Sequence, residues 1–597
     1  MSHWCLLLVV LLLSSTLRAE ELELIRVTSQ KDVNIFTFAE TIQIDDYLLE
    51  TSPTSLISSS LQATEGLVSS QNGGPGGRVS FFIRGTESRH VSFTLDGLKI
   101  NDPSNTDRQF DSAFMTSAFI KGVLLHKGPQ AVLFGSDAMG GTVEMITRKG
   151  ESPGQTRFSL NGGSFGTIDS SLSRDWSSGS NRGTFTVTRF HTDGISRLNR
   201  KRFKAKEKDS ADITQLTSSS NHQWQSRVES DLLVSYLRGK NEFDTFGMDD
   251  SYDRSANDQL VLQQKTRFKL SESSSVSLRN GYTGHRRFIK SLSVGNETYQ
   301  GDLLQHEFLY RRSFEESEVL AGLATDREGS ESTAVDQSFL LHSVFLQGSQ
   351  QVRSLKFQAG ARLDGHSRYG GFGTGSTGVS FAPGPDTFSL QYSQGYKAPS
   401  LYQLYGPPIF GTPLGNEKLR PERNNSWEVS WRREFQKVGT SVTLFQNQLT
   451  NLITFSNLGY LNQGKFTSQG VDGSVKFRQD AWEVSSTFTH QKFIDERSPV
   501  LRRPLNYGSV ALAWFYDESL ESSIRYRFFD SRKDLDLTGK MVKLSGFEAV
   551  EVGMKKTFAD TDLGVQVLNI FNRDYEELYG YSVMPRSVFL HFGRKFQ

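Results

Sequence analysis

The chain has 597 residues, and its 67 basic and 66 acidic residues give a net charge of +1. This length exceeds one ordinary globular core, and the balanced charge gives no general attraction to nucleic acid. With 22% charged residues and a mean hydropathy of −0.43, the composition excludes a helical membrane protein.

The N-terminus carries one continuous apolar run, Trp4–Leu13. This run is shorter than the about 20 residues that a membrane-spanning helix needs. Small residues follow it, so we predict a cleaved signal peptide over residues 1–19, ending at Ala19, although no Lys or Arg precedes the run. A buried first helix is the alternative. Cys5, the single cysteine, would leave with this peptide, which excludes disulfides, a cysteine nucleophile and cysteine-ligated zinc from the mature chain.

Short strand-like runs and tight turns alternate between Val79 and Thr147. Phe81–Ile83 and Val91–Leu95 are two of the runs, and turns such as Asp96-Gly97 separate them. We therefore predict a small mixed α/β domain over residues 36–150, which follows an extended segment over residues 20–35.

From about Ser152 onward, segments of about ten residues alternate apolar and polar side chains. Trp427 and Val429, for example, alternate with Glu428 and Ser430. A β-sandwich could show this pattern, but its strands are usually shorter and its domains smaller. The pattern therefore predicts an all-β outer-membrane barrel of about 22 antiparallel strands over residues 151–597, with the preceding domain filling the lumen.

The strand order also assigns sides to the connections. If the first strand runs outward from an inner domain, a turn at Ser177–Arg182 is periplasmic, and Ile195–Asp212 and Phe243–Asn257 are extracellular loops. The first loop is basic, so it is either a solvated loop or a contact for lipopolysaccharide phosphates or an anionic ligand. The second loop is acidic, so it is either a solvated loop or a site for a divalent cation, with calcium as the candidate. Its spacing does not match an EF-hand, and its candidate metal ligands are Asp244, Asp249, Asp250 and Asp253.

This succession of leader, small turn-rich domain and long barrel resembles the TonB-dependent outer-membrane receptors, and within that family it is most similar to cobalamin receptors. The resemblance implies that the small domain is a plug. It also implies a TonB box, a segment that pairs edge-on with TonB of the inner-membrane TonB–ExbB–ExbD complex; the matching residues are Glu23, Leu24, Ile25, Arg26, Val27 and Thr28. An ordinary extended leader is the alternative. The expected protein is a monomeric transporter in outer-membrane lipid and lipopolysaccharide, not an enzyme, and needs no cofactor.

Two plug segments rich in amides and small residues are candidates for the ligand platform, Gln71–Gly77 and Lys99–Asp107. Such groups suit a large polar ligand, and the first segment is similar to the ligand loop of cobalamin receptors. A phosphate-binding loop is the rival interpretation, but no Gly-Lys-Ser/Thr follows. The candidate ligand residues are Gln71, Asn72, Gly73, Gly74, Lys99, Asn101, Asp102 and Asn105 in the plug, and Tyr402 and Tyr405 in a barrel loop.

The resemblance further implies an ion network in which two plug cations face two barrel carboxylates. The matching residues are Arg84 and Lys127 in the plug, and Glu428 and Asp472 in the barrel. Lys127 stands where the family has arginine, and Asp472 where it has glutamate. Lysine cannot form the bidentate contact of arginine, so this plug–barrel lock is expected to be looser. Scattered surface charges are the alternative.

Two further segments resemble the family, Gly395–Leu401 with the following Gly415–Glu422, and the final strand Ser587–Phe596. No histidine lies between Tyr396 and Glu422, which places haem below cobalamin as cargo. We therefore expect TonB-dependent import of a scarce large nutrient, with cobalamin as the first candidate. A ferric siderophore or haem is the alternative cargo, and a passive porin or surface adhesin is the alternative class.

Overall fold

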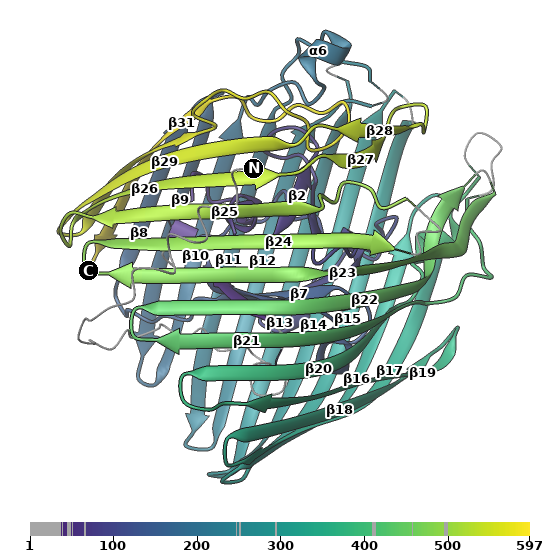
Figure 1. Cartoon of the computed structure of the whole chain (residues 1–597), viewed down its shortest axis with the longest axis vertical. Coiled ribbons are helices and arrows are strands. Elements are labelled where there is room, and N and C mark those ends of the chain that lie inside the picture. Colours follow the sequence, from purple (N-terminus) through teal and green to yellow (C-terminus); the bar gives the residue numbers. More distant parts are fainter. Residues whose placement is uncertain are drawn as a thin grey trace.

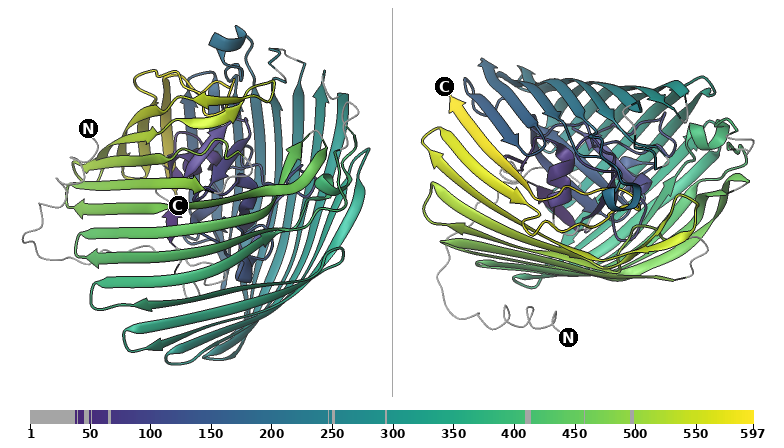
Figure 2. Two further views of the ribbon diagram at one scale, coloured as in Figure 1. Left: turned by 45° about the vertical axis from the view of Figure 1, so that its right-hand side comes forward. Right: turned by 90° about the horizontal axis from the view of Figure 1, so that it is seen from above.

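The computed structural model describes residues 38, 40–44, 49–50, 52–64, 67–245, 247–249, 252–292, 295–408, 414–456, 458–494 and 499–597. A small N-terminal domain lies inside a closed ring of strands (Figure 1; Figure 2, right). In the described residues, the helices are too short and too polar to span a membrane.

Twenty-two strands form the barrel, as predicted, and each pairs antiparallel with its neighbours. In chain order they are β8 (Thr156–Gly163), β9 (Thr167–Ser178), β10 (Asn181–Thr192), β11 (Ala211–Gln225), β12 (Val228–Glu242), β13 (Arg254–Ser271), β14 (Ser274–Ser291), β15 (Gly295–Ser313), β16 (Ser317–Glu331), β17 (Asp336–Val352), β18 (Leu355–His366), β19 (Gly370–Phe381), β20 (Asp386–Lys397), β21 (Glu422–Phe435), β22 (Val438–Ser456), β23 (Gly459–Gln479), β24 (Trp482–Ile494), β25 (Asn506–Phe515), β26 (Leu520–Phe529), β29 (Phe547–Phe558), β30 (Thr561–Leu568) and β31 (Ser587–Phe596). The ring closes where β31 pairs with β8, from Phe589 opposite Gly163 to Phe596 opposite Thr156.

The two faces of the strands differ as the alternating sequence predicts. On β21, Trp427 and Val429 are 49% and 51% exposed on the outer face, whereas Glu428 between them is 3% exposed inside. Successive side chains of a strand point to opposite faces, so the apolar set covers the outside and the polar set lines the lumen.

The connections at the two ends of the barrel differ in length. At one end, here called the turn end, strands join through short turns such as residues 179–180 and 226–227. At the other, the loop end, the connections include residues 193–210 with α6 (Arg200–Phe203), 243–253, and 398–421 with α7 (Leu401–Tyr405). A further connection, residues 530–546, forms the hairpin of β27 (Arg532–Leu535) and β28 (Met541–Leu544).

Both predicted outward loops end earlier than expected, and the first also begins two residues earlier, at residue 193. Residues 211–212 belong to β11 and residues 254–257 to β13, because the strands continue to pair beyond the charged residues, for example Asn241 with Ser255.

The inner domain is built around a five-stranded sheet in the order β1-β6-β7-β4-β5, in which only β4 and β7 run parallel among the described strands. Its elements are β1 (Thr41–Ile44), α4 (Ile57–Ala63), β2 (Val68–Gln71), β3 (Val79–Phe82), η1 (Ser88–His90), β4 (Val91–Leu95), β5 (Leu98–Lys99), β6 (Ile120–Lys127), α5 (Ala131–Phe134) and β7 (Gly141–Thr147). Barrel side chains such as Phe190, Ile213 and Leu237 join its hydrophobic core. The domain is therefore packed against the wall of β10–β13 rather than suspended in the lumen.

Candidate functional site

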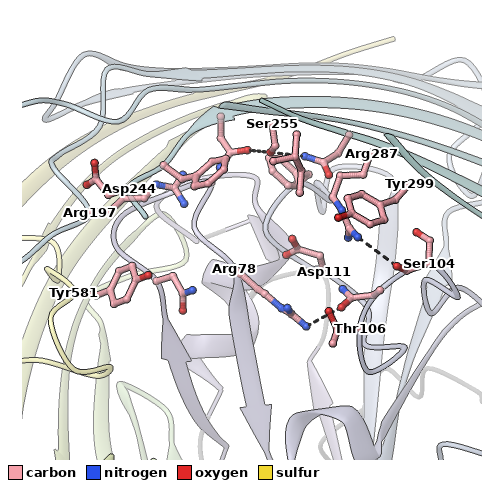
Figure 3. A pocket seen from close by; sticks show the side chains of 18 of the residues that line it. Arg78, Ser104, Thr106, Asp111, Arg197, Asp244, Ser255, Arg287, Tyr299 and Tyr581 are labelled. Atoms are coloured by element: carbon pink, nitrogen blue, oxygen red, sulfur yellow. Dashed lines mark hydrogen bonds between the residues drawn. The ribbon is translucent and has the colours of Figure 1, made fainter. Parts of the chain in front are cut away.

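A cavity of about 310 Å³ lies at the loop end, where the inner domain meets the barrel wall and its loops. Figure 3 shows that it is surrounded by charged and aromatic side chains from both parts, including Arg78, Asp111, Arg197, Asp244, Arg287, Tyr299 and Tyr581. Three arginines and two aspartates line it, so its formal charge is +1, three minus two.

Two of the three arginines form ion pairs with aspartates. Arg78, on the inner domain, lies 3.3 Å from Asp107, and its side chain is 35% exposed. Arg287, on β14, lies 3.4 Å from Asp102, and its guanidinium carbon lies 4.9 Å from the ring centre of Tyr299. Both can contact a ligand while remaining partly neutralised.

Arg197, in the loop over residues 193–210, is different. It is only 4% exposed, and its Nη2 is buried without a hydrogen-bond partner among the residues that the structure describes. Burial lowers the pKa of this guanidinium, and Asp209 and Asp244 offset only part of that effect. Gly73 packs directly on it with φ +80°, and a Cβ there would lie 2.6 Å from Arg197 Cγ. A buried cation with an open donor in a cavity can bind an anionic group.

Aromatic side chains complete the lining. Tyr299, Tyr402 and Tyr581 come from β15 and from two loops that are distant in sequence. Rings at the wall can pack on planar ligand groups, and their hydroxyls can form hydrogen bonds. The cavity thus combines cationic donors with aromatic surface.

The structure places three of the ten predicted ligand residues in the lining of the cavity, namely Asn72, Asn105 and Tyr402. Gln71 and Gly74, close to Asn72 in sequence, do not line the cavity but stabilise the loop that carries Asn72. Gln71 donates from its side chain to the carbonyl oxygen of Gly74 at 3.0 Å, and Gly74 packs on a side chain of the barrel loop.

The other predicted ligand residues do not line the cavity. Lys99 donates to the carbonyl oxygen of Ser136 at 2.8 Å, and Asn101 is fully buried. Asp102 accepts a hydrogen bond from Ser104 Oγ at 2.7 Å. The Tyr405 hydroxyl accepts one from Arg368 at 2.6 Å. These residues shape the loops around the cavity.

Two of the four predicted metal ligands lie together. Asp244, Asp249 and Glu207 each place a carboxylate oxygen within 4.8 Å of the others. Asp209, 2% exposed, lies next to Asp244, and burial raises the pKa of Asp209. These carboxylates, from both loops, could hold a divalent cation.

The remaining two predicted metal ligands are not part of this group. Asp253 accepts a hydrogen bond from Ser291 Oγ at 2.9 Å instead, and Asp250 lies outside the described residues. The predicted signal peptide and TonB box, residues 1–19 and 23–28, also lie outside them.

The basic side chains of α6 form ion pairs with another loop. Lys201 lies 2.7 Å from Asp574, and Arg202 lies 2.7 Å from Glu576. The loop over residues 193–210 is thereby joined to the connection between β30 and β31.

The four predicted lock residues lie together at the interface between the inner domain and the barrel. Arg84 Nε lies 2.7 Å from Asp472, and Arg84 Nη1 lies 2.9 Å from Glu428. Lys127 Nζ lies 3.5 Å from Asp472. A fifth member, Glu40, lies 3.0 Å from Arg84 Nη2 and 3.2 Å from Lys127 Nζ. Each nitrogen of the Arg84 guanidinium therefore faces a different carboxylate.

A second buried ion cluster joins the two parts at Asp137. This side chain is 1% exposed and lies 2.7 Å from both Arg108 and Lys397, the latter on β20 of the barrel. Lys99 Nζ lies 3.5 Å away, and Arg108 also lies 2.8 Å from Glu328 on β16. The segment that carries Lys99 and Arg108 is thus tied to two barrel strands.

Several residues of the cavity and clusters were not found from the sequence. Arg287, Tyr299 and Tyr581 occur singly in unrelated strands and loops, so no local pattern marks them. Glu40 and Asp137 likewise have no motif of their own. Their partners Arg84 and Lys397, the latter in the segment Gly395–Leu401, were the only signal for them, and these contacts form only in the folded chain.

Two family models match the chain. The model described as "TonB dependent receptor-like, beta-barrel" matches residues 153–572, and the "TonB-dependent Receptor Plug Domain" matches residues 37–142. Together they cover the inner domain and most of the barrel.

Solved structures of the same architecture are similar over nearly the full length. The siderophore receptor PirA from Acinetobacter baumannii has a TM-score of 0.79 at 16% identity, covering 96% of this chain and 100% of that one. A mutant of the ferric enterobactin receptor PfeA from Pseudomonas aeruginosa has a TM-score of 0.79 at 14% identity, covering 96% and 100%. The copper transporter OprC has a TM-score of 0.78 at 14% identity, covering 93% and 99%. At these identities the likeness concerns the fold alone.

Proposed function

Because this chain belongs to the family of TonB-dependent receptors, with a plug inside an outer-membrane barrel, we propose that it imports a ferric siderophore. The observation that carries the proposal is the cavity at the loop end, which combines Arg78, Arg197 and Arg287 with three tyrosines. Siderophores commonly present anionic oxygens or aromatic rings around iron, and both groups match this lining.

The size of the cavity supports the same choice. Ligand pockets commonly measure about 300–1,000 Å³, so about 310 Å³ suits a compact chelate. Two of the similar structures are a siderophore receptor and a ferric enterobactin receptor. Cobalamin, the first candidate from the sequence, remains the alternative, and its binding would require the loops to open further.

The transport step would use the two ends of the barrel differently. Outer-membrane barrels have long external loops and short periplasmic turns, so the loop end would receive the ligand from outside. Binding would favour a state in which the segment at Glu23–Thr28 is accessible to TonB. TonB would then pull on the plug, with energy supplied from the inner membrane.

Equilibrium binding to the purified full chain tests the cargo. Ferric catecholate and ferric hydroxamate siderophores, cyanocobalamin and haem would be titrated separately. Saturable binding of a ferric siderophore alone supports the proposal. Tight binding of cyanocobalamin, with no response to siderophores, would replace it by cobalamin import.

Deletion of residues 23–28 tests the energy coupling. Active import predicts that uptake stops while ligand binding is unchanged. Uptake that continues after this deletion would favour a passive porin instead.

We also propose that Glu207, Asp244 and Asp249 bind a divalent cation, with calcium as the candidate. Support comes from their carboxylate oxygens, which lie within 4.8 Å of one another, and from the neighbouring Asp209, a fourth and buried carboxyl. A bound cation would neutralise these carboxylates and join the two loops beside Arg197.

A further inference from the structure

Glu40 connects the N-terminal segment to the ion cluster between plug and barrel. Its carboxylate lies 3.0 Å from Arg84 and 3.2 Å from Lys127, and its carbonyl oxygen accepts a hydrogen bond from the Lys127 backbone at 2.9 Å. Glu40 immediately precedes β1 and is the second described residue after the predicted TonB box. The chain that leads from that box therefore enters the plug at its contact with the barrel.

The charges of this cluster do not balance. Two cations, Arg84 and Lys127, face three carboxylates, so the formal charge is −1, two minus three. Without Glu40, two cations would face the two barrel carboxylates. The Glu40 side chain is also the most accessible member, 13% exposed against 5% or less for the other four. Since an unbalanced buried charge is costly, Glu40 is the carboxylate whose removal disturbs the cluster least.

The strand that follows Glu40 is weakly attached to the plug, because it lies at the edge of the sheet. β1 is an edge strand, and it contacts the plug sheet through four residue pairs with β6. The first pair is Thr41 with His126, whose side chains approach to 3.0 Å, and Lys127 is the next residue of β6. Two residues before Glu40, the backbone N–H of Phe38 donates to Gln391 Oε1 of the barrel at 2.8 Å. A pull from the N-terminal side thus reaches this single bond first, then the Glu40 ion pairs, and only then the strand pairing.

We infer that Glu40 is the release link between the N-terminal segment and the plug. Its ion pairs hold β1 in place at rest. Once the Phe38 bond has broken, a pull removes this carboxylate before it opens the strand pairs, and leaves Arg84 in balanced contact with Glu428 and Asp472. The inference depends on the proposed function only for the source of the pull.

Hydrogen–deuterium exchange of the full chain in lipid nanodiscs tests the resting contact. In Glu40→Gln, the amides of residues 41–44 are expected to exchange about tenfold faster than in the wild type, which is what loss of one buried charge-assisted contact predicts. The amides of β4 and β7 should keep their rates, which shows that the plug remains folded. Equal exchange of residues 41–44 in both proteins would overturn the inference.

Two further variants sharpen this test. Glu50→Gln is the matched control, because Glu50 is a plug carboxylate 3.4 Å from Arg148 and outside the cluster; it should leave β1 unchanged. Glu40→Asp keeps the charge on a shorter side chain, so its exchange should lie between those of the wild type and Glu40→Gln. An increase of the same size in Glu50→Gln would also overturn the inference.

Permeability separates the release link from the lock itself. Glu40→Gln should keep the outer membrane closed to a large antibiotic, since the remaining charges balance, whereas Arg84→Gln should open it. Equal leakage in both variants would contradict the role of Glu40. Neither measurement uses cargo or TonB, so failure of siderophore binding would leave this result unaffected.

Discussion

At the scale of single residues, the fold buries Arg197 without fully neutralising it. Burial of a charge is unfavourable unless partners compensate, and the Nη2 of Arg197 has none in the described residues. The empty site therefore carries an energetic cost that an anionic ligand would remove. This makes Arg197, rather than the more accessible Arg78, the side chain on which affinity should depend most.

Replacement of Arg197 by Gln should weaken binding of an anionic chelate at least about thirtyfold, because loss of a buried charged contact costs about 2–5 kcal/mol. The empty protein should become slightly more stable to heat. Isothermal titration and thermal unfolding measure the two effects. Lys201→Gln, in the same loop but 79% exposed, is the control and should change neither; equal losses in both variants would point to a general effect of charge.

Cation binding at Glu207, Asp244 and Asp249 should depend on pH. Burial raises the pKa of the neighbouring Asp209, so this group keeps its proton to a higher pH than usual. A cation beside Asp209 favours its charged form, so calcium affinity should rise as pH increases through the raised pKa and fall below it. Without calcium, the stability of the loops should instead fall as pH rises through this pKa, because deprotonation of Asp209 destabilises them.

Calcium titrations at several pH values would measure this dependence. Asp244→Asn should abolish binding, whereas Asp253→Asn, outside the group, should retain it. Affinity that does not change with pH would exclude a role for Asp209.

At the scale of elements, β1 should have to leave β6 during transport. A disulfide between Cys residues introduced at Thr41 and His126, which face each other, should stop uptake under oxidising conditions. Reduction should restore it, because the strand is then free again. Ligand binding is the internal control and should persist in both states; uptake by the oxidised protein would show that β1 stays in place.

Alternation in the sequence was sufficient to predict the barrel. Trp427, Glu428 and Val429 lie on the faces that their order indicates, because the period of a strand fixes the side of each residue. Strand ends were less predictable, since residues 254–257 continue β13 by pairing with the opposite strand. The cavity was the least predictable part, because Arg287 and Tyr581 meet only after the barrel closes. Lys99 was predicted wrongly as a lining residue. Its place in a polar loop suggested ligand contact, but its side chain lies toward Asp137.

At the scale of the whole molecule, two buried ion clusters attach the plug to the barrel. One joins Arg84 to β21 and β23, and the other joins Asp137 to β20. Each cluster has its own barrel partners, so loss of one should loosen the plug while the other still holds it.

Asp137→Asn should destabilise the plug by about 3–5 kcal/mol, as expected when one partner of a buried ion cluster is removed. Arg108 would keep its ion pair with Glu328, whereas Lys397 would lose its partner at 2.7 Å. Chemical denaturation followed by exchange of the plug amides would measure the loss. Asp107→Asn is the control, because Asp107 is 28% exposed and pairs with Arg78 near the surface; its effect should stay below about 1 kcal/mol.

The seam between β31 and β8 has a consequence for biogenesis. The closing strands come from opposite ends of the barrel sequence, with Phe589 opposite Gly163, so this pairing must wait for the last residues to be synthesised. Contacts between such distant residues form slowly. The plug precedes the barrel in the chain and packs on β10–β13, far from the last strand in sequence. Before β31 pairs with β8, the plug can therefore enter the open sheet from the side. Pairing of the C-terminal strand then encloses the plug in the barrel.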